Sequence, residues 1–196
     1  MLQSIRRVVT GHDSEGRSIV LSDESADATA AELPFWPGRG STAIWTTPTG
    51  PASNREEDLP RQITGFPLPG SGGVALMFME LPPDSELESM PEEQRSLASS
   101  PVARLFPEAY EIDTSKSFQM HATDTVDFVV LLSGEVTLLV DEGEVVLKPF
   151  DVVIQRGVNH GWVNRGTTPA LIAAAVIDAV PLDRRRSGPK GVDVAT

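Results

Sequence analysis

The sequence contains no cysteine. Disulfide bonds, thiolate metal sites, cysteine-held iron–sulfur clusters and cysteine nucleophiles are therefore excluded. Long hydrophobic runs are also missing: the longest fully apolar stretch, Ala170 to Ile177, is far shorter than the roughly 20 residues that a membrane-spanning helix needs. The first ten residues carry two arginines with no apolar stretch behind them, so no secretory signal is indicated. We expect a cytoplasmic protein that does not act in a membrane.

Positive charge is scarce. The chain has 16 Lys and Arg against 28 Asp and Glu, a formal net charge of -12. Such a surface repels phosphate backbones unless a basic patch compensates for it. The densest basic run, Arg184 to Arg186, is interpreted as part of a solvated tail. We therefore expect no nucleic-acid partner.

Helical patterns are scarce as well. Ser89 to Ala98 has a serine that could cap a helix, a proline inside the first turn and acidic residues at its start, and is the only segment with a clear helix signature. The rest of the first half predicts β structure joined by long loops. The expected strands are Ile5–Thr10 and Ser18–Ser22, which would form a hairpin, with Thr42–Thr47 and Val74–Leu81; the expected loops are Ala26–Gly40 and Pro48–Pro69.

The second half of the chain is a series of short strands. From Phe118 to Ala179, apolar segments of strand length are separated by turn residues that include Gly134, Gly143 and Gly157. Strands joined by turns this short must pair antiparallel, and this spacing favours a sandwich or closed barrel. With 196 residues, one domain is expected. We predict N-terminal strands, long loops and a short helix packed on the barrel over 1–110, the barrel core over 111–180, and a flexible tail over 181–196.

Histidine is rare too, with three in the chain. His12 lies in the predicted N-terminal turn, whereas His121 and His160 lie in strand-like segments of the second half. His121 and Asp127 share odd parity, so in an uninterrupted strand they would face the same side. A histidine and a carboxylate on an interior face are costly unless they are paired or bind a metal. The pattern indicates a polar site inside the barrel.

Two short motifs in this region resemble those of the cupin superfamily. The first has a histidine, a second histidine two positions on, a glutamate four further and a glycine seven beyond; the corresponding residues here are His121, Thr123, Asp127 and Gly134. The second has a glycine, then proline-any-glycine, a histidine and an asparagine; here these are Phe150, Gln155 to Gly157, His160 and Asn164, with one residue fewer before Gln155. The resemblance implies an all-β antiparallel jelly-roll barrel with an N-terminal strand extension and a short helix.

The sequence departs from the motifs at two metal-ligand positions. Thr123 stands where the second histidine belongs, and Asp127 where the glutamate belongs. What the resemblance implies is a divalent metal, Fe(II), zinc or manganese, held by His121, Asp127 and His160. The alternative is a metal-free polar pocket in which the same residues are hydrogen-bonded to one another. Gln119 and Gln155 are candidate polar groups of this pocket.

Two classes of function are compatible with this site. The first is a metal-dependent enzyme acting on a small organic substrate, of the dioxygenase, decarboxylase, lyase or isomerase type, with Asp127, Thr123 and Arg156 as the catalytic candidates. Arg156 would hold a substrate carboxylate. The second is a metal-free binding module for a small acid or sugar. In either case the expected partners are a small molecule and a second copy of the chain, in a homodimer paired through sheet edges.

Overall fold

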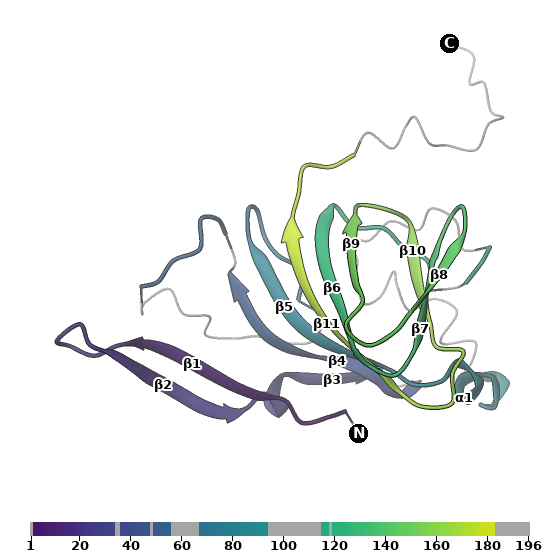
Figure 1. Ribbon diagram of the computed structural model, residues 1–196, viewed down its shortest axis with the longest axis horizontal. Coiled ribbons are helices and arrows are strands. Elements are labelled where there is room, and N and C mark those ends of the chain that lie inside the picture. The colour runs from purple at the N-terminus through teal and green to yellow at the C-terminus, as the bar shows by residue number, and fades with distance from the viewer. Residues whose placement is uncertain are drawn as a thin grey trace, which may run out of the picture.

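The computed structural model describes residues 2–33, 36–47, 49–55, 67–93, 115–117 and 119–182. Nearly all of its regular structure is β-strand (Figure 1). The elements in chain order are β1 Arg6–His12, β2 Ser18–Ser25, the 3-10 turn Asp27–Thr29, β3 Ala30–Leu33, β4 Trp36–Thr47, β5 Val74–Leu81, α1 Asp84–Glu88, β6 Thr125–Ser133, β7 Val136–Val140, β8 Glu144–Leu147, β9 Val152–Arg156, β10 His160–Val163 and β11 Ala170–Asp178.

The strands form two facing sheets and a separate hairpin. The larger sheet has six strands in the order β3-β4-β5-β11-β6-β9, and the smaller has three in the order β10-β7-β8. All of these neighbouring strands pair antiparallel, as predicted. In Figure 1 the two sheets curve around a common interior, and the hairpin β1–β2 projects to one side. The all-β jelly-roll prediction is confirmed.

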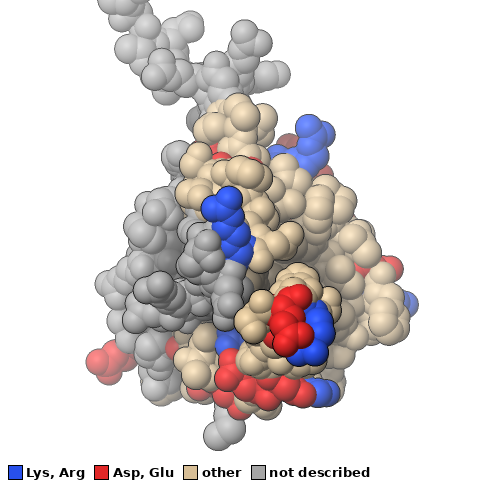
Figure 2. Space-filling view, turned by 90° about the vertical axis from the view of Figure 1, so that its left-hand side faces the viewer, with Lys and Arg blue, Asp and Glu red and all other residues tan. Residues whose placement is uncertain are grey.

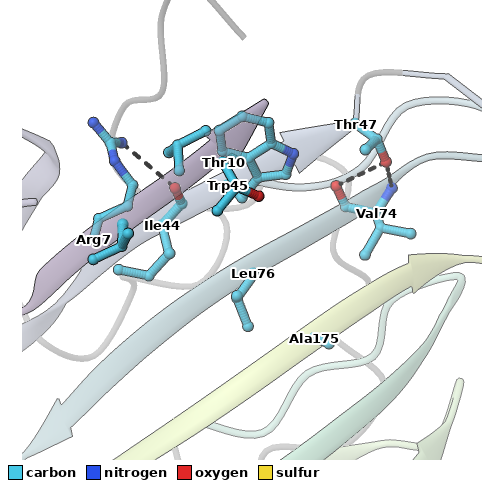
Figure 3. Close-up of a pocket in the computed structure, with 10 residues that line it drawn as sticks. Arg7, Thr10, Ile44, Trp45, Thr47, Val74, Leu76 and Ala175 are labelled. Atoms are coloured by element: carbon cyan, nitrogen blue, oxygen red, sulfur yellow. Dashed lines mark hydrogen bonds between the residues drawn. The ribbon is translucent and has the colours of Figure 1, made fainter. Parts of the chain in front are cut away.

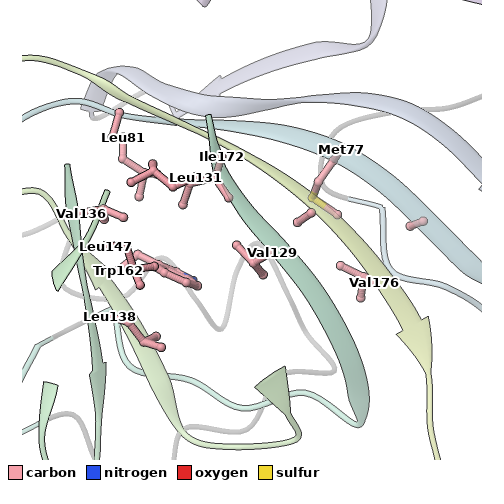
Figure 4. Close-up of a cluster of buried hydrophobic side chains, with 13 residues drawn as sticks. Met77, Leu81, Val129, Leu131, Val136, Leu138, Leu147, Trp162, Ile172 and Val176 are labelled. Carbon is pink, nitrogen blue, oxygen red and sulfur yellow. The ribbon is translucent and has the colours of Figure 1, made fainter. Parts of the chain in front are cut away.

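A hydrophobic core fills part of the space between the sheets. Val129 and Leu131 of β6, Met77 of β5 and Ile172 of β11 face Trp162 of the smaller sheet (Figure 4). Each of these side chains is at most 5% exposed. The alternation of buried and exposed residues along β6 follows from the two-residue period of a strand, which directs one side of β6 inward.

The first half of the chain contributes more strand than its composition suggests. The range Ala26–Gly40 is expected to be a loop, and this is wrong: β3 and the start of β4 lie in it. Pairing of β3 with β4, and of β4 with β5, supplies hydrogen bonds that local glycine and proline content does not reveal. The predicted strand Val74–Leu81 is confirmed with the same bounds.

The observed helix precedes the predicted one. α1 covers Asp84–Glu88 and buries Leu87, so it ends where the predicted segment Ser89 to Ala98 begins. Within the predicted segment, Glu92 and Glu93 are helical, and residues 94–98 lie outside the described residues. No helix in the described part of the chain is long and apolar enough to cross a membrane.

The predicted ranges 1–110, 111–180 and 181–196 meet at or near residues that the structure does not describe. Residues 101–114, which contain the expected boundary near 110, and the tail from 183 onward lie outside the described residues. β5, from the first range, pairs with β11, from the second, so both ranges contribute to one sheet.

Candidate functional site

The backbone brings His121 and His160 together. His121 lies just before β6, and His160 opens β10 of the smaller sheet. The two residues form an isolated antiparallel bridge: the His121 amide donates to the His160 carbonyl at 2.9 Å, and the His160 amide donates to the His121 carbonyl at 2.8 Å. The two rings lie 4.4 Å apart between centroids, at an angle of 48°. Residues 39 positions apart in the chain thus form one pair.

Backbone carbonyls fix the tautomer of both rings. His121 Nδ1 lies 2.8 Å from the Gln119 carbonyl oxygen, and His160 Nδ1 lies 2.9 Å from the Val158 carbonyl oxygen. Since a carbonyl oxygen only accepts, each Nδ1 must carry the hydrogen in a neutral ring. Each Nε2 is then left with its lone pair, the form in which histidine binds a metal or accepts a hydrogen bond.

Burial keeps both histidines neutral. The pKa of His121 is lowered to about 3, chiefly by desolvation and also by the nearby His160 and Arg39, while the Gln119 carbonyl and Asp127 act in the opposite direction. Desolvation also lowers the pKa of His160, against its hydrogen bond with the Val158 carbonyl. Near neutral pH the pair therefore presents two uncharged imidazoles rather than two cations.

The opposite sheet contributes Asp127 of β6 and Gln155 of β9. The two residues are directly paired in register, and both are buried. Gln155 Nε2 donates to Asp127 Oδ2 at 3.0 Å and to His160 Nε2 at 3.2 Å. Gln155 therefore connects the carboxylate on the larger sheet with the histidine on the smaller one.

The carboxyl of Asp127 is in an unfavourable place for a charge. Burial raises the pKa of Asp127 above its usual range, although hydrogen bonds from Thr125 and Gln155 and the neighbouring His121 lower it. Its Oδ1 is buried and has no hydrogen-bond partner, and the same holds for Gln155 Oε1. Two buried oxygen atoms without a donor are the type of group that a metal ion or a ligand satisfies.

The other two sequence candidates occupy different places. Thr123 is buried, and its hydroxyl lies 2.7 Å from that of Thr125, at the edge of the cluster. Arg156 is exposed and follows Gln155 on β9, so it faces the opposite side of the strand. The structure thus brings Thr123 close to the cluster and does not bring Arg156 to it.

The donor types of the cluster suit a divalent metal. Two imidazole Nε2 atoms and a buried carboxylate oxygen are ligands of iron, zinc and manganese. In this arrangement, however, Gln155 Nε2, which is a hydrogen-bond donor and not a ligand, lies between Asp127 and His160. Over the ranges that the structure describes, no three His, Asp or Glu side chains stand together as a ready metal site. Side-chain movement of Gln155 would be needed before Asp127 could join the two histidines.

Sequence reasoning missed one residue near this cluster. Arg39 of β4 donates from Nη2 to the side-chain oxygen of Gln119 at 2.5 Å, across 80 positions of sequence. Nothing in the local sequence around Arg39 signals this contact, because it depends on how β4 is placed against the segment before β6.

A second hollow lies elsewhere. A groove of about 490 Å³ runs between the hairpin and the outward face of the larger sheet (Figure 3). Its lining is mainly apolar, with Ile44, Trp45 and Leu76 prominent, and Arg7 spans its edge with a hydrogen bond to the Ile44 carbonyl at 3.5 Å. Leu76 and Ala175 belong to the face of the sheet opposite the core, so this groove is separate from the histidine pair.

The surface on the hairpin side carries scattered charge. Among the described residues in Figure 2, blue Lys and Arg side chains occur in small separate groups, some of them beside red acidic side chains. Asp13, Glu15 and Arg17 form one such mixed group at the hairpin turn.

Comparison with known proteins gives consistent matches. Residues 109–177 match the family model described as "Cupin domain". The chain is 27% identical over 184 residues to the "Phomopsin biosynthesis cluster protein C'" of Diaporthe leptostromiformis, covering 93% of this chain and 82% of the relative. It is 26% identical over 183 residues to the "Cupin-domain-containing oxidoreductase fogC" of Aspergillus ruber, covering 90% of this chain and 74% of the relative.

A solved structure is similar over most of the chain. It is that of an uncharacterized conserved protein with a double-stranded beta-helix domain from Klebsiella pneumoniae, with 14% identity and a TM-score of 0.42. The match covers 80% of this chain and 89% of that one.

Proposed function

Because the chain belongs to the cupin superfamily, we propose that it is a metal-dependent enzyme acting on a small organic substrate, of the oxidoreductase kind. The observation that carries the proposal is the His121–His160 pair, whose two neutral rings keep their Nε2 lone pairs free of protons. Two relatives support an enzymatic role, one named as an oxidoreductase and one named for a biosynthesis cluster.

His121 and His160 would hold the metal, with Asp127 as the third ligand. A divalent metal at this place would polarise a carbonyl or hydroxyl of the substrate or activate oxygen. Gln155 would then turn from its present bridging position and leave Asp127 for the metal. Thr123 and Thr125 would hold the neighbouring polar groups in place through their 2.7 Å contact.

Elemental analysis of protein purified without chelator tests the metal. The expected result is about one equivalent of iron, zinc or manganese per chain. His160→Ala should lose it, since two protein ligands alone bind weakly. His12→Ala, in the remote hairpin, should keep the wild-type metal content, and is the matched control. A metal content that survives the loss of both His121 and His160 would overturn the assignment.

A metal-free binding module is the second candidate. The observation in its favour is that Gln155 satisfies both Asp127 Oδ2 and His160 Nε2 without an ion. Wild-type protein that purifies without metal and takes up none in dialysis, but that still binds a small acid, would select this candidate over the enzyme.

A homodimer is part of the proposal. β9 is an edge strand of the larger sheet, and its outward face carries Val152 and Ile154, 59% and 54% exposed, beside Phe128 of β6, 45% exposed. Apolar side chains at a sheet edge favour pairing with a second copy. Light scattering at a protein concentration on the order of tens of micromolar should give twice the mass of one chain. The variant Ile154→Lys should give the mass of one chain. A cytoplasmic location stays a prediction.

A further inference from the structure

Arg39 lies on the face of β4 that is directed into the space between the two sheets. Residues opposite one another in an antiparallel pair share a face, and Ser41 and Ala43 of β4 lie opposite Met79 and Met77 of β5. Met77 is part of the buried core between the sheets. Arg39, two residues before Ser41, therefore belongs to the same inward-facing row. An arginine in such a row needs a reason, because burying a charge is costly.

The guanidinium of Arg39 is only partly satisfied. Nη2 donates to Gln119 Oε1 at 2.5 Å, and the group lies 5.0 Å from the centre of the Trp36 ring. Nη1 is buried and has no hydrogen-bond partner, and within the described ranges Arg39 forms no ion pair. Burial lowers the pKa of Arg39 to about 10, while Asp84 raises it, so the group stays positive at neutral pH.

Gln119 carries a second buried N–H donor without an acceptor, beside that of Arg39 Nη1. Its Oε1 accepts from Arg39, and its Nε2 is buried without a partner. Its backbone carbonyl accepts from His121 Nδ1, so the same residue joins Arg39 to the histidine pair. Two buried N–H donors, one of them on a cation, stand beside the site with no acceptor. A carboxylate has two acceptor-only oxygens and is the natural complement of such donors.

We propose that Arg39 and Gln119 bind the carboxylate of an acidic substrate next to His121 and His160. The proposal deepens the proposed function, since it makes the substrate of that same site an organic acid. Arg39 holds one carboxylate oxygen through Nη1, and Gln119 Nε2 holds the other. The rest of the substrate then extends towards the histidine pair, to which Gln119 is joined through its backbone carbonyl.

The test is a titration of chelator-treated, full-length protein with sodium acetate. The readout is the NMR signals of the Arg39 and Gln119 side-chain N–H groups, with sodium chloride at equal ionic strength and neutral acetamide as reference ligands. Acetate should shift these signals in a saturable way, and acetamide should not. Arg39→Gln should weaken acetate binding by about 10- to 100-fold, the usual loss for a hydrogen bond to a charged group.

Two further variants separate binding from folding. Gln119→Glu supplies Arg39 with a carboxylate of its own and still accepts its hydrogen bond, so it should abolish acetate binding while the protein stays folded. This variant carries the test if Arg39→Gln fails to fold. Arg17→Gln removes the same charge from the distant hairpin turn and should leave acetate binding unchanged.

The outcomes distinguish this proposal from the proposed function. No saturable response in the wild type, or a response that survives both Arg39→Gln and Gln119→Glu, overturns the carboxylate site. Because the titration uses chelator-treated protein, it does not depend on a metal. Acetate binding through Arg39 in a protein that never takes up metal would reject the metal-dependent enzyme and support the carboxylate site. A protein that binds metal but shows no response to acetate would reject the carboxylate site and leave the metal-dependent enzyme standing.

Discussion

His121 and His160 are joined twice, by two backbone hydrogen bonds of 2.9 and 2.8 Å and by contact of their rings at 4.4 Å. The bridge makes the segment before β6 a neighbour of β10 in the smaller sheet. The orientation of both rings is fixed by hydrogen bonds to backbone carbonyls, so the backbone itself positions the pair.

Acid should destabilise the protein through these histidines. An unfolded histidine has a pKa of about 6.5, whereas that of folded His121 is lowered to about 3. Below about pH 6.5 the unfolded chain binds protons that the folded chain does not, so stability falls as the pH falls towards 3. Each such histidine contributes a slope of at most about 1.4 kcal/mol per pH unit.

Urea denaturation of chelator-treated protein between pH 4.5 and 7 measures this slope. His121→Asn should lower the slope of stability against pH by up to about 1.4 kcal/mol per pH unit relative to the wild type, which corresponds to one proton. Comparison of the two proteins cancels the contribution of the carboxyl groups. An identical slope in both proteins would contradict the prediction.

Gln155 should matter for stability because it joins two buried acceptors. Gln155→Leu leaves Asp127 Oδ2 and His160 Nε2 each without this donor, and we expect a loss of about 1–3 kcal/mol in the free energy of unfolding. Replacing both members of a hydrogen-bonded pair by apolar groups costs less than removing one. Asp127→Leu combined with Gln155→Leu should therefore recover part of the loss, measured by urea denaturation at pH 7. Strictly additive losses would argue against a coupled pair.

The turn between β6 and β7 requires a glycine. Gly134 has a φ of 78°, and a Cβ there would lie 2.7 Å from both the Ala170 Cα and the Pro169 carbonyl oxygen. Gly134→Ala should cost about 1–2 kcal/mol for the left-handed conformation and a further 1–3 kcal/mol, roughly, for the close contact. Gly16→Ala is the control, since its φ is 77° and no atom lies within 4 Å of the new Cβ. Denaturation that shows equal losses at the two positions would refute the steric part.

Phe150 occupies a position that favours glycine. Its φ is 75°, its side chain is 81% exposed, and it lies between β8 and β9. Left-handed backbone costs a non-glycine residue about 1–2 kcal/mol, so Phe150→Gly should stabilise the protein by up to about 1 kcal/mol after the added flexibility is counted. Val152→Gly, at an exposed position in the extended strand β9, should instead destabilise it. Thermal denaturation of the two variants should show opposite signs; the same sign in both would count against the strain.

Much of the β structure follows from local patterns. Val74–Leu81 is apolar except for Glu80 and is followed by two prolines, and it is a strand with those bounds. Alternation along β6 correctly places Asp127 inward, because strand side chains alternate between faces. The same rule treats His121 as part of the strand that contains Asp127. In the structure His121 lies before β6 and pairs with His160, the first residue of β10 in the smaller sheet.

Two positions of the second motif, Phe150 and Asn164, have structural roles. Its glycine position holds Phe150, and the backbone there is left-handed all the same. Its asparagine position holds Asn164, which is fully buried and donates to the carbonyls of Leu81 and Thr168, so it fastens the turn between β10 and β11. Both residues serve the barrel, and neither touches the histidine cluster.

The sequence by itself determined the antiparallel β class, the likeness to cupins and the identity of His121, Asp127 and His160 as site candidates, because strand period, turn residues and motif spacing are local properties. Only the tertiary structure decided that Gln155 lies between Asp127 and His160, that Arg156 faces outward, and that Arg39 reaches Gln119. These are contacts between strands of different sheets or between distant segments. Their formation depends on how the sheets pack around the core, and no pattern of neighbouring residues encodes that packing.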